Sequence, residues 1–154
     1  MTSKHKYQAY TAATQTVAKT QQIIMLYDGV IRLIQQSKDA IGENRIEDRY
    51  HLVMKASNII HGLQGCLDFE NGGEIANVLY SFYSSIDSQL FSIHRTNSAQ
   101  TCDEVIASLK QMRDAWSAVD SKMLEQDALS APVAEESEIP AAPKGPLPSV
   151  TLSA

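Results

Sequence analysis

The distribution of proline constrains the fold of this chain more than any other feature. All five prolines lie beyond position 131, at Pro132, Pro140, Pro143, Pro146 and Pro148. Proline inside a helix removes a backbone hydrogen bond and clashes with the preceding turn, at a cost of about 3 kcal/mol. The long proline-free body therefore predicts a helical fold. The proline-rich end predicts a segment that does not belong to the helical body.

Apolar residues recur at helical spacing in four segments of the body. These segments cover residues 20–41, 45–67, 74–94 and 101–123. Short polar connections between long helices favour antiparallel neighbours. We therefore expect an all-α fold, an antiparallel up-down four-helix bundle over residues 20–126. The first two helices are apolar on more than one side, which predicts more apolar surface than the bundle can cover.

Punctuating residues separate the four segments. Gly42 is a stop signal for the first helix, and Gly72 with Gly73 breaks the chain before the third, since glycine adopts positive φ at little cost. Two pairs at capping-box spacing predict helix starts. They are Asn44 with Glu47 and Thr101 with Glu104.

The two ends of the chain differ from the body. Residues 1–19 combine a weak amphipathic spacing with several threonines, which lower helix propensity, so we expect a mobile N-terminal cap segment. Residues 127–154 are expected to form a disordered proline-rich tail, because they cannot bury enough apolar surface to offset ordering. The tail has no assignable role.

Charge and hydropathy exclude several classes of partner. The net charge is −5, and residues 125–154 hold five acidic side chains and one basic one, so the body is nearly neutral. A neutral body lacks the basic stripe that nucleic acid requires. No apolar run approaches the roughly 20 residues of a membrane span, and no secretory signal opens the chain. We expect a cytoplasmic protein with no membrane insertion.

Catalytic and metal-binding patterns are missing from the sequence. Di-metal bundles need two Glu-x-x-His pairs, and Asp48 with His51 is the single near match. There is no phosphate loop, dinucleotide fingerprint or nucleophile elbow. We expect no enzyme, no cofactor and no metal. Cys66 and Cys102 are interpreted as buried packing residues, with a redox or disulfide pair as the alternative, and Trp116 is placed on the core stripe of the fourth helix.

Three stretches together resemble the flagellar secretion chaperones, the flagellin-export chaperone family. They are "MLYDGVIR" at 25–32, "GGEIANVLY" at 72–80 and "MRDAW" at 112–116, and "YQAY" at 7–10 resembles the opening segment of that family. The similarity spans residues 7–120. The chain departs from the family in lacking a proline at the start of the first helix and in carrying the long tail.

The resemblance implies a cytoplasmic helical bundle that binds the disordered C-terminal region of flagellin in apolar grooves. It implies that binding prevents premature polymerisation and assists delivery to the flagellar type III export apparatus, whose components are further expected partners. The motif matches imply partner-binding roles for Tyr7, Tyr10, Tyr27, Asp28 and Gly29. Two neighbours complete the candidate set, Val17 in the cap segment and Leu26 beside Gly29. The alternative function is a helical-bundle adaptor or signalling module that binds a folded partner.

Two candidate residues have a structural interpretation as well. Gly29 interrupts an apolar helix at a cost of about 1 kcal/mol, which lets another backbone approach, either a neighbouring helix or the flagellin segment. Asp28 either pairs with Arg32 four residues on or anchors a polar group of the partner. The sequence leaves both alternatives open.

Overall fold

The structure of the protein is a computed structural model. It describes the backbone of residues 2–130 and the side chains of residues 19–126, 128 and 129. The described chain forms four α-helices and no strand: α1 (Thr2–Gly42), α2 (Ile46–Gly65), α3 (Phe69–Thr96) and α4 (Ala99–Ser130). The predicted all-α fold is confirmed.

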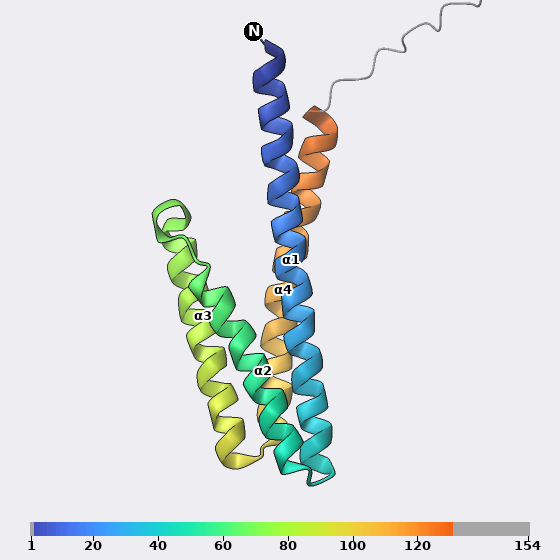
Figure 1. Ribbon diagram of the computed structural model, residues 1–154, viewed down its shortest axis with the longest axis vertical. Helices are drawn as coiled ribbons and strands as arrows, with labels where there is room; N and C mark the ends of the chain where they lie inside the picture. The colour runs from blue at the N-terminus through green and yellow to red at the C-terminus, as the bar shows by residue number, and fades with distance from the viewer. Residues whose placement is uncertain (1, 131–154) are drawn as a thin grey trace, which may run out of the picture.

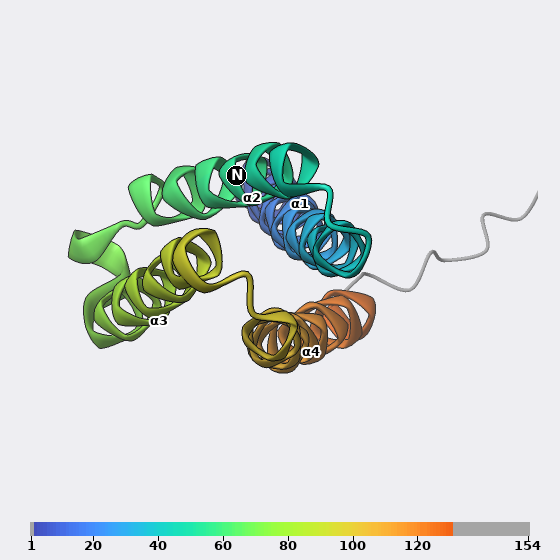
Figure 2. The same ribbon diagram turned by 90° about the horizontal axis from the view of Figure 1, so that it is seen from below.

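Consecutive helices run in opposite directions, and each packs against its two neighbours in a closed ring. The packed pairs are α1 with α2, α2 with α3, α3 with α4, and α4 with α1. Figure 2 shows this ring from below. The arrangement is the expected up-down bundle, with α1 and α3 on one diagonal and α2 and α4 on the other.

The core fills the space between the four helices with residues from every helix. Its fully buried members include Tyr27 and Ile34 of α1, Val53 and Ile60 of α2, Tyr83, Ile86 and Leu90 of α3, and Cys102, Val105 and Leu109 of α4. Burying each large apolar side chain contributes about 1.5–3 kcal/mol. The predicted burial of the cysteines holds for Cys102 alone, because Cys66 is exposed; both thiols are free.

The two helix pairs are unequal in length, and this opens the bundle at one end. The helices α1 and α4 have 41 and 32 residues, whereas α2 has 20. In Figure 1, α2 and α3 lean away from α1 and α4 towards the end that carries the α2–α3 connection. The bundle is therefore closed at the α1–α2 and α3–α4 connections and splayed at the opposite end.

The first and last helices extend well beyond their predicted bounds. The helix α1 begins at Thr2 rather than near residue 20, because no glycine or proline precedes Gly29 and each threonine costs less than about 1 kcal/mol. The helix α4 continues to Ser130, past the expected boundary at residue 126. The rest of the expected tail, residues 131–154, lies outside the described residues.

Both predicted capping boxes are wrong. Asn44 adopts a left-handed φ of 56° after the end of α1, and Arg45, the residue before α2, makes no side-chain cap. Ser98 caps α4 instead of Thr101, since its Oγ accepts the Thr101 N–H at 3.1 Å. Capping geometry depends on the path of the incoming chain, which residue spacing alone does not fix.

The third helix begins five residues earlier than the predicted Glu74. Asp68 caps it by accepting the backbone N–H groups of Glu70 and Asn71 at 3.0 and 3.1 Å. A hydrogen bond from the Asn71 side chain, together with these backbone hydrogen bonds, lowers the pKa of Asp68. Gly73 then adopts a φ of 50° inside the helix and bends it, which only glycine does at little cost.

Candidate functional site

An apolar cleft lies where α2 and α3 lean away from the other two helices. Its volume is about 270 Å³, and every helix contributes to its walls. The lining residues are Ile23 of α1, Leu63 of α2, Cys66, Leu67 and Asp68 of the connection, Gly72, Ile75, Ala76, Leu79 and Tyr83 of α3, and Trp116 of α4. We call this set the apolar cleft.

The cleft exposes side chains that the amino-acid pattern assigned to the core. Ile75 keeps 71% of its surface exposed, although it shares the apolar stripe of α3 with Leu79 and Ile86. Trp116 is half-buried and packs against the edge of the core. From the closed end of the bundle towards Ile75, α3 diverges from α4. At the level of Ile75, no neighbouring helix is therefore close enough to cover the apolar stripe of α3. The result is a groove that another apolar chain can fill.

A pair of tyrosines forms the floor beneath the cleft. Tyr27 is fully buried, and its hydroxyl donates to the Tyr83 hydroxyl at 2.9 Å. Its ring also stacks on Phe82 with centroids 6.5 Å apart. Burial raises the pKa of the Tyr27 hydroxyl far above its ordinary value, and the hydrogen bond to Tyr83 adds to the rise. Tyr27 therefore supports the cleft through Tyr83, which lines it, rather than reaching the surface itself.

Asp28 connects two of the stretches on which the family resemblance rests. Its carboxylate accepts a hydrogen bond from the Arg113 guanidinium of α4 at 3.0 Å, and Arg113 also contacts Asp114 at 2.9 Å. The expected pair with Arg32 is not formed. These two carboxylates raise the pKa of Arg113, with Asp28 contributing most. Because both side chains are more than a third exposed, solvent screens the attraction between them and the pair contributes little to stability.

Gly29 and Leu26 lie on the surface of α1 rather than under a neighbouring helix. A Cβ atom added at Gly29 would meet nothing within 4 Å, so the expected close approach of another helix is not found among the described residues. Leu26 keeps 42% of its surface exposed. Of the two interpretations given for Gly29, only the contact with a partner remains, and it stays a prediction.

The three N-terminal candidates lie on the first turns of α1. Tyr7, Tyr10 and Val17 belong to the helix that begins at Thr2, but their side chains lie outside the described set. Figure 1 shows this part of α1 continuing the helix axis beyond the α2–α3 pair. The structure therefore does not bring these three positions together with the cleft.

Sequence reasoning identified the excess of apolar surface but not the residues that form the cleft. Leu63, Leu67 and Leu79 repeat at ordinary core spacing, as do Ile75 and Trp116. The available signal was the second apolar stripe of the helix predicted at 45–67, which includes Leu63 and Cys66. That stripe indicates that the helix is buried on a second side, but it does not show which of its turns remains exposed.

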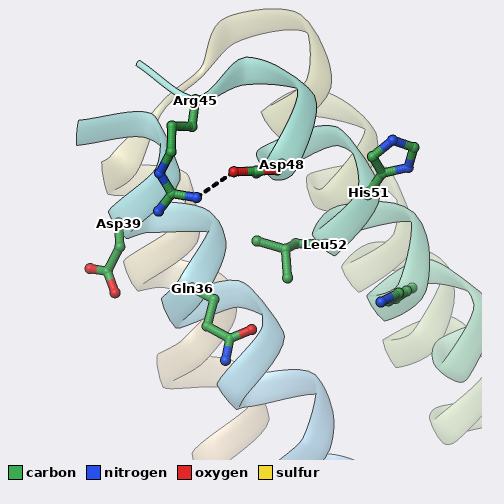
Figure 3. A pocket seen from close by; sticks show the side chains of 7 residues that line it. Gln36, Asp39, Arg45, Asp48, His51 and Leu52 are labelled. Carbon is green, nitrogen blue, oxygen red and sulfur yellow. Dashed lines mark hydrogen bonds and ion pairs between the residues drawn. The ribbon is translucent and has the colours of Figure 1, made fainter. Parts of the chain in front are cut away.

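A second hollow, between the end of α1 and the first half of α2, is polar. Its volume is about 370 Å³, and its lining is shown in Figure 3: Gln36, Asp39, Arg45, Asp48, His51, Leu52 and Lys55. Arg45 pairs with Asp48 and with Glu43, each at 2.6 Å. Among the side chains that the structure describes, no group of three His, Cys, Asp or Glu residues is placed to hold a metal ion. The charges in this hollow largely neutralise one another, so we take the apolar cleft as the candidate site.

None of the helices between residues 2 and 130 is both long enough and apolar enough to cross a membrane.

The fold and the cleft together define an antiparallel four-helix bundle with an apolar groove open to solvent. Residues 3–123 match the protein family "Flagellar protein FliS". The chain belongs to this family, whose members are flagellar secretion chaperones, and it has the role of a flagellar export chaperone.

Individual relatives agree with this assignment. The flagellar secretion chaperone FliS of Campylobacter jejuni is 34% identical over 112 residues, which cover 71% of this chain and 87% of the relative. FliS of Salmonella typhimurium is 30% identical over 118 residues, covering 76% and 87% of the two chains. A solved structure described as a flagellar chaperone from bacteria shares the fold, with a TM-score of 0.63, 18% identity and coverage of 70% and 85%.

Proposed function

We propose that this chaperone binds the disordered C-terminal region of flagellin in the apolar cleft. Binding there keeps flagellin from polymerising in the cytoplasm and assists its delivery to the flagellar type III export apparatus. The observation that carries the proposal is the exposure of Ile75, 71%, in a cleft to which every helix contributes. An amphipathic helix that lays its apolar face into such a groove is a common mode of peptide recognition.

The chemistry of the cleft fits an apolar client segment. Each large apolar side chain that leaves water there contributes about 1.5–3 kcal/mol, and the half-buried Trp116 offers a broad aromatic wall. Asp68 supplies a carboxylate at the rim. Because a disordered client loses conformational freedom when it binds, several such anchors are needed before the complex is stable.

The exposed face of α1 extends the proposed contact surface. Leu26 supplies an apolar side chain, and the open position at Gly29 lets a client backbone approach closely. We propose that the segment with Tyr7, Tyr10 and Val17 covers part of the client surface in the free protein and contacts the client afterwards. Such a segment reduces the apparent affinity by the fraction of molecules in which it is closed.

Calorimetric titration with a peptide from the C-terminal end of the cognate flagellin tests this function. Coupled folding predicts a negative heat-capacity change and a gain of helical circular dichroism. Ile75→Asp should weaken binding at least tenfold, because it places a charge in the apolar cleft. The matched control is Phe91→Asp, since Phe91 is a similarly exposed residue of α3, 67%, outside the cleft.

The titration also separates this function from that of an adaptor for folded partners. A chaperone of the proposed kind binds the isolated peptide, whereas an adaptor requires the tertiary structure of its partner. Equal affinities of the wild-type protein, Ile75→Asp and Phe91→Asp would remove the cleft from the mechanism. Failure of the peptide to bind while folded flagellin binds would favour the adaptor.

A further inference from the structure

The last helix directs the chain towards the open end of the bundle. The helix α4 ends at Ser130, beside the first half of α1 and at the end of the molecule where α2 and α3 lean away (Figure 1). Residues 131–154 follow this point. The segment that leaves α4 therefore begins at the same end of the bundle as the apolar cleft (Figure 1).

The sequence of this segment divides into an acidic part and an uncharged apolar part. Its three glutamates lie at 135, 136 and 138, whereas residues 145–154 carry no charge and contain Leu147, Val150 and Leu152. Pro146 and Pro148 flank the first of these apolar residues and fix their own φ angles. A segment restricted in this way loses less conformational entropy on binding than a flexible one.

We propose that residues 147–152 of the same chain occupy the apolar cleft when no client is bound. The cleft is lined mainly by apolar side chains, and Leu147, Val150 and Leu152 supply the matching anchors. The acidic part stays outside, because an unpaired carboxylate in an apolar groove is costly. The tail is then an internal competitor that a client must displace; only this last step rests on the function proposed above.

The length of the connecting chain fits this placement. The part of α4 between Trp116 and Ser130 is about 21 Å long at 1.5 Å per residue, so the tail must turn back by roughly that distance. Residues 131–146 reach about 50 Å when extended and average roughly 20–24 Å as a flexible coil. A linker whose average length matches the span gives an effective concentration on the order of 1 mM. An intrinsic Kd of about 0.1 mM then fills the cleft in roughly nine molecules of ten.

Trp116 provides a direct reporter, because it lines the cleft and is the single tryptophan of the sequence. Acrylamide quenching of its fluorescence is measured on the full chain and on a full-length variant with Leu147→Ser, Val150→Ser and Leu152→Ser. The variant should be quenched more strongly and emit at longer wavelength. A full-length control with Val133→Ser and Ile139→Ser, which changes apolar residues outside 147–152, should behave like the wild-type chain.

Further outcomes distinguish the occupant of the cleft. A peptide of residues 145–154 added to the triple variant should restore the protection of Trp116. Equal quenching of all three proteins would overturn the proposal, and protection that grows with protein concentration would assign the cleft to a second copy and overturn it as well. None of these measurements contains flagellin. If the triple variant also binds the flagellin peptide about tenfold more tightly, the competition is supported; if the quenching difference persists without any peptide binding, the proposed function fails and the tail contact stands.

Discussion

The hydroxyl groups of Tyr27 and Tyr83 lie 2.9 Å apart and join α1 to α3 across the diagonal of the bundle. Both tyrosines are almost completely buried, and burial raises the pKa of each hydroxyl. The two helices do not pack directly against each other. This hydrogen bond and the adjoining aromatic contacts therefore span the diagonal directly beneath the apolar cleft.

We expect Tyr83→Phe to lower the free energy of unfolding by about 1–3 kcal/mol, because it leaves the buried Tyr27 hydroxyl without its acceptor. Replacing both tyrosines by phenylalanine should cost less than the sum of the two single changes, since no polar group is then left unpaired. Urea unfolding of the four proteins of this double-mutant cycle measures the coupling. Strictly additive effects would show that the hydrogen bond contributes no coupling energy.

The sequence was sufficient to predict the four helices and their order. The proline-free body favours helix throughout, Gly42 marks the end of α1, and Gly73 lies at the bend in the first turns of α3 rather than before it. The short connections between the helices leave few topologies. The angle between the helix pairs was not predictable, because it follows from how the longer α1 and α4 pack beyond the reach of α2. Ile75 and Trp116 carry the same apolar spacing as core residues, and the spacing does not reveal that the helices have separated at that level.

Trp116 shows how the separation of the helices changes the expected effect of a substitution. A fully buried tryptophan replaced by alanine costs on the order of 3–5 kcal/mol, which is the value that its place on the core stripe predicts. Because Trp116 is only half-buried and lines the cleft, we expect Trp116→Ala to cost about 2 kcal/mol and also to weaken flagellin binding. Denaturant unfolding and peptide titration of the same preparation check both effects. A loss of stability with unchanged affinity would show that Trp116 has a purely structural role.

His94 makes the stability of the closed end of the bundle dependent on pH. Its Nδ1 lies 2.9 Å from Nη1 of Arg49, and because arginine can only donate, His94 must accept this hydrogen bond in its neutral form. Burial and the charge of Arg49 lower the pKa of His94. Because the pKa of His94 is lower in the folded state, neutral His94 contributes its full stabilisation above the unfolded-state pKa of about 6.5. This contribution is lost as the pH falls through the folded-state pKa.

We therefore expect the free energy of unfolding to decrease between pH 7.5 and pH 5.5, as measured by urea unfolding. His94→Gln should show a smaller decrease, because its side chain does not titrate. His51→Gln serves as the control, since it makes the same substitution at a histidine whose side chain is 62% exposed. An identical pH dependence of His94→Gln and the wild-type protein would show that His94 does not cause the loss of stability at low pH.

At Gly29, the effect of a substitution on stability can be distinguished from its effect on client binding. A Cβ atom at this position meets nothing within 4 Å, and alanine is favoured over glycine in a helix interior by about 1 kcal/mol. Gly29→Ala should therefore raise the free energy of unfolding by up to that amount. If a flagellin backbone approaches α1 here, Gly29→Gln should lower client affinity even though the helix becomes more stable, because the longer side chain occupies the space of the client.

Gly62 is the matched control, because it is a helical glycine in the last turn of α2 and is equally open to an added Cβ. Gly62→Ala and Gly62→Gln should stabilise the protein to a similar extent without changing peptide affinity. Denaturant unfolding and calorimetric titration of the four variants measure the effect of each substitution on the free energy of unfolding and on the affinity for the peptide. If Gly29→Gln binds the peptide as tightly as Gly62→Gln does, no client backbone approaches Gly29, and the helix-propensity cost of that glycine has another origin.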